Sequence, residues 1–203
     1  MRGGGSTIRP VVLLVTVSLD GILAEDGTPF MAFTRALGEH PAARDEFLLA
    51  SLRGAGLQVM GRVTYERLAQ HFQAAAGEAG DAEADLLNRI PKAVFSRTLG
   101  RTPWGAPAIL RGAPAAVLDG LRRHGSGDIL VHGGARLAQS LAGLNAVDEY
   151  RLLAYPFVAG SGCRLLANGT GLVPLAMVRS QTFSHGVAGL VYRRDRNAEE
   201  GQP

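Results

Sequence analysis

The feature that most constrains this chain is a series of short, nearly uninterrupted apolar segments, each followed by a turn and a helical pattern. Residues 11–19 read VVLLVTVSL, and residues 128–132 read DILVH. Such segments are typical of strands that are buried on both faces of a sheet. Because helices on both faces of a parallel sheet bury strands in this way, the pattern favours an α/β fold.

The alternation of strand and helix continues along the chain. Further strands are predicted at residues 57–61, 92–96, 106–110, 147–158, 172–183 and 186–194, and helices at 41–55, 62–72, 113–124 and 135–144, with a short helix ending near Arg89. Glycine and histidine between the last two strands predict an antiparallel hairpin. We therefore predict a doubly wound, mostly parallel sheet with helices on both faces and a C-terminal antiparallel hairpin.

A chain of 203 residues suits one domain. We expect a flexible arm over residues 1–9, a single domain over 10–195 and a disordered tail over 196–203. The single cysteine excludes an intramolecular disulfide and a multi-cysteine metal site. No apolar stretch is long enough to cross a bilayer, and no signal peptide is recognisable, so a cytoplasmic location is expected.

The formal charge of +3 indicates no particular macromolecular partner. There is no long basic run and no basic face interleaved with aromatic residues, so we expect no nucleic-acid partner. A modest positive balance is compatible with a small anionic ligand.

In open α/β sheets, ligands bind beyond the carboxyl ends of the strands, so the loops that follow the strands carry the candidate residues. Gly133 and Gly134 stand between a buried strand and a helix. Without side chains there, a phosphate can approach the helix N-terminus closely. The alternative is that the two glycines serve only tight packing between strand and helix.

Two more strand ends carry donors suited to phosphate. Gly61 precedes Arg62 and Thr64 at a helix start, and Ser96 and Arg97 follow another strand. A guanidinium and a hydroxyl both donate hydrogen bonds to phosphate oxygens. Each pair alone is equally consistent with a capped helix and an exposed arginine. Together with the glycine pair they predict an extended ligand that carries more than one phosphate group.

Two titratable residues are candidates for the chemistry. Asp20 leaves the first strand and is predicted to orient a polar substrate, the alternative being a turn aspartate bonded to nearby backbone. His132 ends a strand beside the glycines and is a candidate proton donor, the alternative being a structural, hydrogen-bonded histidine.

Five segments taken together resemble the dihydrofolate-reductase-like superfamily, and most closely its branch containing the reductase domain of riboflavin biosynthesis and similar stand-alone proteins. They occur in the order TVSLDGILAEDG (16–27), MGRVTYERL (60–68), VFSRTL (94–99), LVHGGARLAQSL (130–141) and VDEYRLLAYPFVAGSGCRLL (147–166). The resemblance spans nearly the whole chain. It implies hydride transfer from NADPH to a C=N or C=O bond of a small heterocyclic, pyrimidine- or pterin-like substrate.

The resemblance also implies where NADPH lies. Gly133, Gly134, Ala135, Arg136 and Leu137 would hold the diphosphate, with a cis peptide between the two glycines. Gly61, Arg62 and Thr64 would lie along the cofactor, while Ser96 and Arg97 would face the adenosine end and its 2′-phosphate. The nicotinamide would lie near Thr16, with Ile22 as an apolar wall.

Three functions stay open at this point. The chain is a reductase of a small heterocycle, a true dihydrofolate or pterin reductase, or a nucleotide-binding module without turnover. The family resemblance further predicts a homodimer formed through the late strands.

Overall fold

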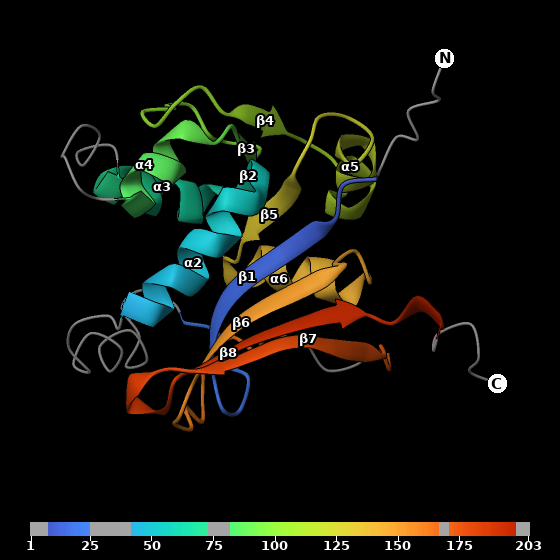
Figure 1. The fold of residues 1–203 in the computed structure, drawn as a ribbon. Coiled ribbons are helices and arrows are strands. Elements are labelled where there is room, and N and C mark those ends of the chain that lie inside the picture. The colour runs from blue at the N-terminus through green and yellow to red at the C-terminus, as the bar shows by residue number, and fades with distance from the viewer. Residues whose placement is uncertain (1–7, 25–41, 73–81, 167–170, 198–203) are drawn as a thin grey trace, which may run out of the picture.

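A computed structural model describes residues 8–24, 42–72, 82–166 and 171–197. Within them, one sheet has the strand order β4-β3-β2-β5-β1-β6-β8-β7 (Figure 1). The strands are β1 (Val11–Ser18), β2 (Ala55–Gly61), β3 (Lys92–Phe95), β4 (Ala108–Leu110), β5 (Asp128–His132), β6 (Glu149–Tyr155), β7 (Leu175–Thr182) and β8 (Ala188–Arg194). The helices are α2 (Ala42–Gly54), α3 (Arg62–Phe72), α4 (Ala82–Arg89), α5 (Pro114–Leu121) and α6 (Ala135–Gly143), with a 3₁₀ turn at Ser184–Gly186.

The predicted mixed sheet is confirmed. The neighbours from β4 to β6 run parallel, and β8 pairs antiparallel with both β6 and β7. The central strand is β1, in which Leu13 lies opposite Val131 of β5 and Tyr150 of β6. Its apolar run is explained by this position, because neither of its faces meets water.

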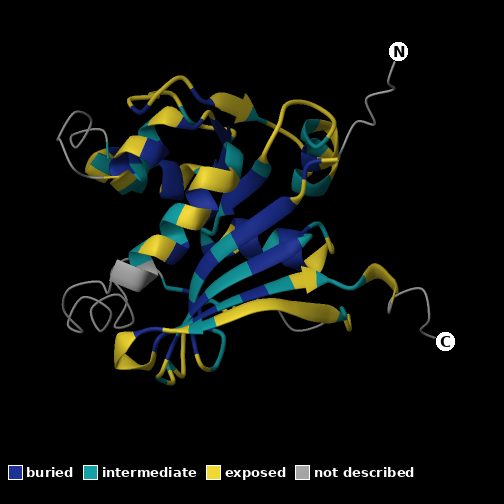
Figure 2. Ribbon diagram, viewed as in Figure 1, coloured by how far each residue is buried: buried dark blue, intermediate teal, exposed yellow. Residues whose placement is uncertain are grey.

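Helices cover both faces of the sheet, as predicted. Alternate β1 residues point to opposite faces, so Val11 and Leu13 pack on the side of α5 and α6, while Val12 packs on the side of α2, α3 and α4. Figure 2 shows the buried residues concentrated in the central strands and on the inner sides of the helices. Within the described ranges, none of the helices combines the length and apolar character that a bilayer span requires.

The first described residues are fixed to the domain. Residues 1–7, most of the expected arm, lie outside the described residues. Arg9, the expected end of that arm, is buried, and its guanidinium donates from Nε to the carbonyl of Gly127 and from Nη1 to that of His124, both at 2.7 Å. Most of the expected tail, residues 198–203, also lies outside the described residues.

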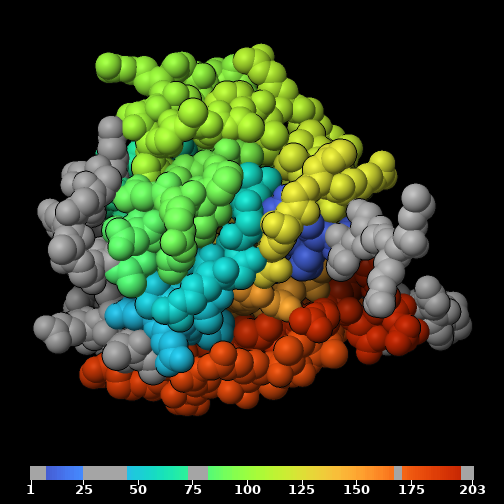
Figure 3. Space-filling view, turned by 45° about the horizontal axis from the view of Figure 1, so that its top comes forward, coloured from blue at the N-terminus to red at the C-terminus, as the bar shows by residue number. Residues whose placement is uncertain are grey.

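Ion pairs tie strands and helices together at the edge of the sheet opposite the carboxyl ends of the parallel strands. Asp148 accepts a hydrogen bond from the backbone N–H of Val11 at 2.8 Å and pairs with Arg122 and Arg196. Nearby, buried Glu149 bridges Arg151 and Arg193. The charged residues of these ion pairs line a groove. In Figure 3 the groove lies where the blue start of β1 is seen between yellow and red segments. The ion pairs of this groove join the start of β6 to the ends of α5 and β8, and the hydrogen bond from Val11 adds the start of β1.

Candidate functional site

Four candidate loops lie along one edge of the sheet, because they follow strands that are neighbours in the order β3-β2-β5-β1. Gly61 of β2 lies opposite Phe95 of β3, so Ser96 is the next residue along the adjoining strand. On the other side, His132 of β5 lies opposite Leu14 of β1. The topology therefore brings together segments that are more than a hundred residues apart in the sequence.

Tight packing requires both residues of the glycine pair. A Cβ on Gly133 would lie 2.1 Å from Cγ1 of Val15, and a Cβ on Gly134 would lie 2.5 Å from Oγ1 of Thr64. Real Cβ atoms do not approach so closely, so any side chain here would push β1 and α3 away. Packing alone is thus sufficient to account for the glycines, and it leaves room for a ligand as well.

The expected cis peptide between Gly133 and Gly134 is wrong, since the described residues contain no cis peptide bond. The backbone keeps the direction of the strand past His132. The N–H of Gly133 donates to the carbonyl of Leu14 at 3.2 Å, as in a continued parallel ladder. Gly134 then adopts an extended conformation (φ −83°, ψ 141°) as the N-cap of α6.

Two helices begin side by side at this edge. α3 starts at Arg62 directly after β2. α6 starts at Ala135, with two residues between it and β5, the neighbour of β2. The first-turn N–H groups of a helix have no intrahelical partner and carry a partial positive charge. A Cβ on Gly61 would meet no atom within 4 Å, so the space in front of β2 is open. This arrangement suits an anion with two phosphate groups.

The predicted phosphate donors differ in their surroundings. Arg62 is exposed and pairs with Glu66 at 3.0 Å within α3. Thr64 is buried against the glycine pair. The hydroxyl of Ser96 caps its own turn, accepting from the N–H groups of Thr98 at 3.1 Å and Leu99 at 2.8 Å. The capping alternative therefore describes Ser96 as it stands.

The remaining residues predicted to bind the cofactor include two buried and two exposed side chains. Ala135 and Leu137 point into the core, so only their backbone N–H groups are available to a ligand. Arg136 and Arg97 are exposed. Both guanidinium groups are thus on the surface at the edge where the helices begin.

A cavity of about 180 Å³ lies beside the glycine pair, on the α2–α4 side of the sheet. Three of the predicted residues meet there, namely Thr16, His132 and Gly133. Two charged residues that were not predicted from the sequence also line it: Arg67 of α3 and Glu83 of α4. Arg67 lies one turn after Thr64, a spacing that could have revealed it. Glu83 falls in a stretch of small and polar residues that gave no such signal.

Asp20 does not line this cavity. Its carboxylate instead links two loops by hydrogen bonds. It accepts hydrogen bonds from the hydroxyl of Ser18 at 2.6 Å and from the N–H groups of Ala159 and Gly160, both at 2.9 Å. The Ser18 hydroxyl, followed by the backbone of Ala159, lowers the pKa of Asp20 to about 2. The carboxylate is therefore ionised at neutral pH and engaged by the protein.

Ile22 lies in the same loop and is also not among the residues that line the cavity. It is buried, and a Cβ on Gly162 would lie 2.6 Å from its Cγ2. It also forms an isolated antiparallel bridge with Arg164. Ala24, two residues later, lines the cavity instead.

His132 contributes a neutral imidazole. Burial is the main cause that lowers its pKa to about 4, with repulsion from Arg67 and then Lys92 adding to it. At pH 7 only about one molecule in a thousand would carry the imidazolium form. A hydrogen-bonding role for His132 is therefore better supported by its surroundings than a role as a cationic proton donor.

Residues 9–188 match the family model described as the RibD C-terminal domain. The chain belongs to this family. The resemblance predicted from the five sequence segments is therefore confirmed for this RibD C-terminal domain protein.

Other proteins resemble this RibD C-terminal domain protein over nearly its full length. The uncharacterized protein YyaP of Bacillus subtilis (strain 168) is 29% identical over 195 residues, which cover 91% of this chain and 94% of the relative. A Thermotoga maritima diaminohydroxyphosphoribosylaminopyrimidine deaminase/5-amino-6-(5-phosphoribosylamino)uracil reductase matches with a TM-score of 0.62 and 16% identity, covering 92% of this chain and 57% of that one. Dihydrofolate reductase from Enterococcus faecalis, complexed with NADP(H) and RAB-propyl, matches with a TM-score of 0.57 and 10% identity, covering 92% and 96%.

Proposed function

We propose that this protein is an NADPH-dependent reductase that transfers a hydride to a C=N or C=O bond of a small pyrimidine- or pterin-like heterocycle. One observation carries the proposal: two helix N-termini start at neighbouring strand ends, directly beside a cavity lined by apolar and polar side chains. Membership of the RibD C-terminal domain family and the reductase activities of the two similar solved structures support it.

The residues present fit a dinucleotide diphosphate. The backbone N–H groups at the starts of α3 and α6 would bind its oxygens, and the glycine pair keeps the approach to α6 free of side chains. Arg97 would face a 2′-phosphate, because it is exposed beyond β3, the strand next to β2. Arg62 would have to exchange its partner Glu66 for the ligand.

The cavity would hold the reacting ring of the substrate. When bound, NADPH supplies the hydride. Thr16 and His132 would orient the ring by hydrogen bonds, while the leucine side chains of α2, α3 and α4 exclude water from it. The Asp20 carboxylate would act at a distance, by fixing the loop that runs from β1 to Ala24.

Arg97→Ala is expected to weaken NADPH binding at least about tenfold and to leave NADH binding unchanged, because a charge-assisted hydrogen bond to phosphate is worth about 1.5–3 kcal/mol. Nicotinamide fluorescence and thermal stabilisation, titrated with each nucleotide, measure both affinities. The matched control is Arg123→Ala, an exposed arginine that follows α5, away from the helix N-termini and from β7.

Nucleotide titrations and turnover assays on the same protein preparation distinguish binding from catalysis. If wild-type protein binds neither nucleotide, the reductase proposal is overturned. If it binds NADPH but oxidises it with no aminouracil, pterin or small imine, the protein is a binding module without turnover. Tight methotrexate binding with dihydrofolate turnover would identify a folate reductase.

We also propose that the protein forms a homodimer through β7. This edge strand is exposed along almost its whole length, and Leu175, Met177 and Val178 are 42%, 55% and 50% exposed (Figure 2). An exposed edge strand with apolar residues is a template for pairing with another strand. A second copy of β7, related by a twofold axis, would satisfy the backbone groups of both edges.

Met177→Lys is expected to convert the dimer into a monomer, because a charge would then be buried at the strand pairing. Sedimentation equilibrium measures the mass directly. Val63→Lys is the control, since Val63 is 70% exposed on α3, away from β7. A monomeric wild type, or a Met177→Lys variant that remains dimeric, would contradict the assignment of this interface.

A further inference from the structure

One atom at the cavity has no role in holding the fold. The Nε2 atom of His132 is shielded from solvent and has no hydrogen-bond partner among the described residues. Folded proteins satisfy most buried polar atoms, and an unsatisfied one destabilises the protein. Nε2 therefore points to a ligand that completes its bonding.

The position of His132 in its strand places its side chain on the cavity side of the sheet. In β5, Leu130 packs in the cluster between the sheet and α2, α3 and α4, while Ile129 and Val131 pack on the opposite face. Because strand residues alternate, the His132 side chain lies on the face of Leu130. The cavity is on that same face, and His132 is part of its lining.

The electrostatics of the lining restrict the chemistry of an occupant. Among the described residues, the charged members of the lining are Arg67 and Glu83, one of each sign, and the imidazole is neutral at pH 7. Most of the remaining lining residues are leucine, phenylalanine, valine and alanine, including Leu48, Leu52 and Phe72. Because these two charges balance each other, a net charge on an occupant would lose its hydration without a surplus countercharge in the lining.

We propose that this cavity selects a small, flat, uncharged heterocycle and that Nε2 of His132 is the hydrogen-bonding atom that recognises it. The proposal deepens the reductase assignment and rests on it for calling this occupant the substrate. His132 is then a residue that determines specificity. Any phosphate or carboxylate on the natural substrate lies outside the cavity.

Two pairs of probes, in each of which one member is uncharged and the other carries a carboxylate, test the proposal. They are uracil against orotate, and pyrazinamide against pyrazinoate. Each is titrated into ¹⁵N-labelled protein while the imidazole nitrogens are followed by NMR, and His132→Leu identifies the His132 signals among those of the five histidines. We expect at least one uncharged probe to shift the Nε2 signal of His132 and to bind at least ten times more tightly than its carboxylate.

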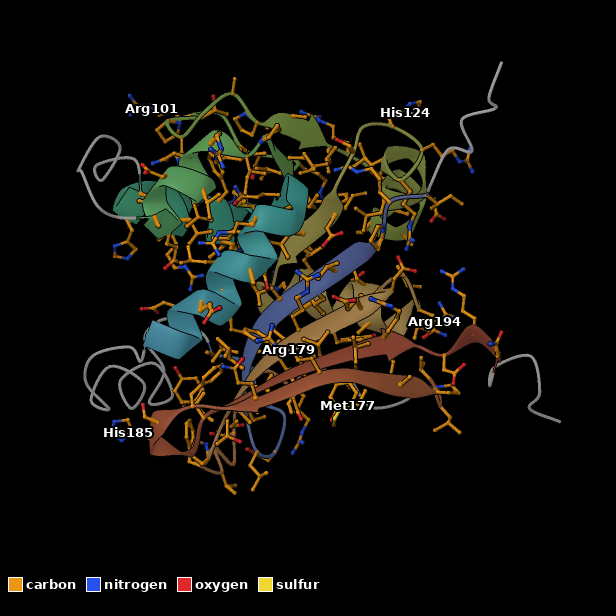
Figure 4. The ribbon with its side chains drawn as sticks, in the orientation of Figure 1. Arg101, His124, Met177, Arg179, His185 and Arg194 are labelled. Atoms are coloured by element: carbon orange, nitrogen blue, oxygen red, sulfur yellow. The ribbon has the colours of Figure 1, made fainter. Side chains whose placement is uncertain are left out.

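Variants separate recognition from structure. His132→Leu is expected to weaken the uncharged probes about tenfold while raising the Tm of the free protein, because it removes an unsatisfied buried atom. His132→Gln, which keeps a polar group in the same space, should retain part of the affinity. His124→Leu, an exposed histidine beyond α5 at the opposite edge, should change neither quantity (Figure 4).

Three results would overturn the proposal: no shift of the His132 signal by either uncharged probe up to about 10 mM, equal affinity for the carboxylates, or full affinity in His132→Leu. The same samples are titrated with NADPH. If uracil binds through His132 but NADPH does not bind, the reductase assignment fails and the recognition site stands. If NADPH binds and both uncharged probes leave His132 unaffected, the reductase assignment stands and the recognition site is overturned.

Discussion

Gly133→Ala should lower the stability of the folded protein by about 1–3 kcal/mol, which for a chain of this size is a fall in Tm of roughly 3–10 °C. The added methyl would lie 2.1 Å from Cγ1 of Val15, which is 5% exposed. Valine is restricted at χ1 and is held in the core, so it cannot rotate away without a clash. Either the central strand or α6 must therefore move. Thermal or urea unfolding measures the loss.

The control for this substitution lies at the C-terminal end of α6, the helix that follows the glycine pair. Gly143→Ala ends α6 at a position where an added Cβ meets no atom within 4 Å, and it should be neutral or stabilising by up to about 1 kcal/mol. The double variant Gly133→Ala/Val15→Ala should lose less than the sum of its parts, because the clashing methyl group is gone. Full additivity would show that the loss at Gly133 has another cause.

Asp148→Ala should destabilise the protein by about 3 kcal/mol or more, a fall in Tm of roughly 6–12 °C. Its carboxylate satisfies the N–H of Val11 at the start of the central strand and the guanidinium of Arg122, whose side chain is 11% exposed. Removing it leaves a buried donor and a largely buried positive charge without their main acceptor. Arg122 keeps the carbonyl of Ala146 at 3.0 Å, so some compensation remains.

An exposed ion pair provides the comparison for Asp148. Arg62 and Glu66 pair at 3.0 Å with side chains that are 45% and 43% exposed, so Glu66→Ala should change the unfolding free energy by less than about 0.5 kcal/mol. Half-molar salt should leave the Asp148→Ala loss nearly unchanged, because buried pairs are screened little. Equal effects of the two substitutions would show that burial does not strengthen the pairs of the groove.

The sequence predicts the elements of this fold well, because the signals for them are local. The apolar run at residues 11–19 predicts a doubly buried strand, and β1 covers Val11–Ser18. Turn residues and helical spacing similarly place every described helix to within a few residues. Gly133 and Gly134 are predictable as a point of close approach. Glycines weaken the strand and the helix that they join, so their presence there indicates that backbone or a ligand comes near them.

The partners of the site residues are not predictable in this way. Asp20 is engaged by Ala159 and Gly160, which lie 139 and 140 residues further along the chain. Glu83 meets the cavity only because α4 packs beside α2 and α3. The sequence likewise carries no indication that Nε2 of His132 lacks a partner, since that depends on every element packed around it. Motifs identify a site, whereas the tertiary contacts decide what each residue does there.

The place of β1 in the sheet has a consequence for how the protein is made. Both partners of this strand, β5 and β6, begin at or after Asp128. As the chain leaves the ribosome, its first and most apolar strand therefore has no neighbour until the later half has been synthesised. Long-range pairing of this kind is slow and leaves apolar surface exposed in the meantime. Over the interval between the synthesis of Ser18 and that of His132, this apolar strand therefore lacks both of its partners in the sheet.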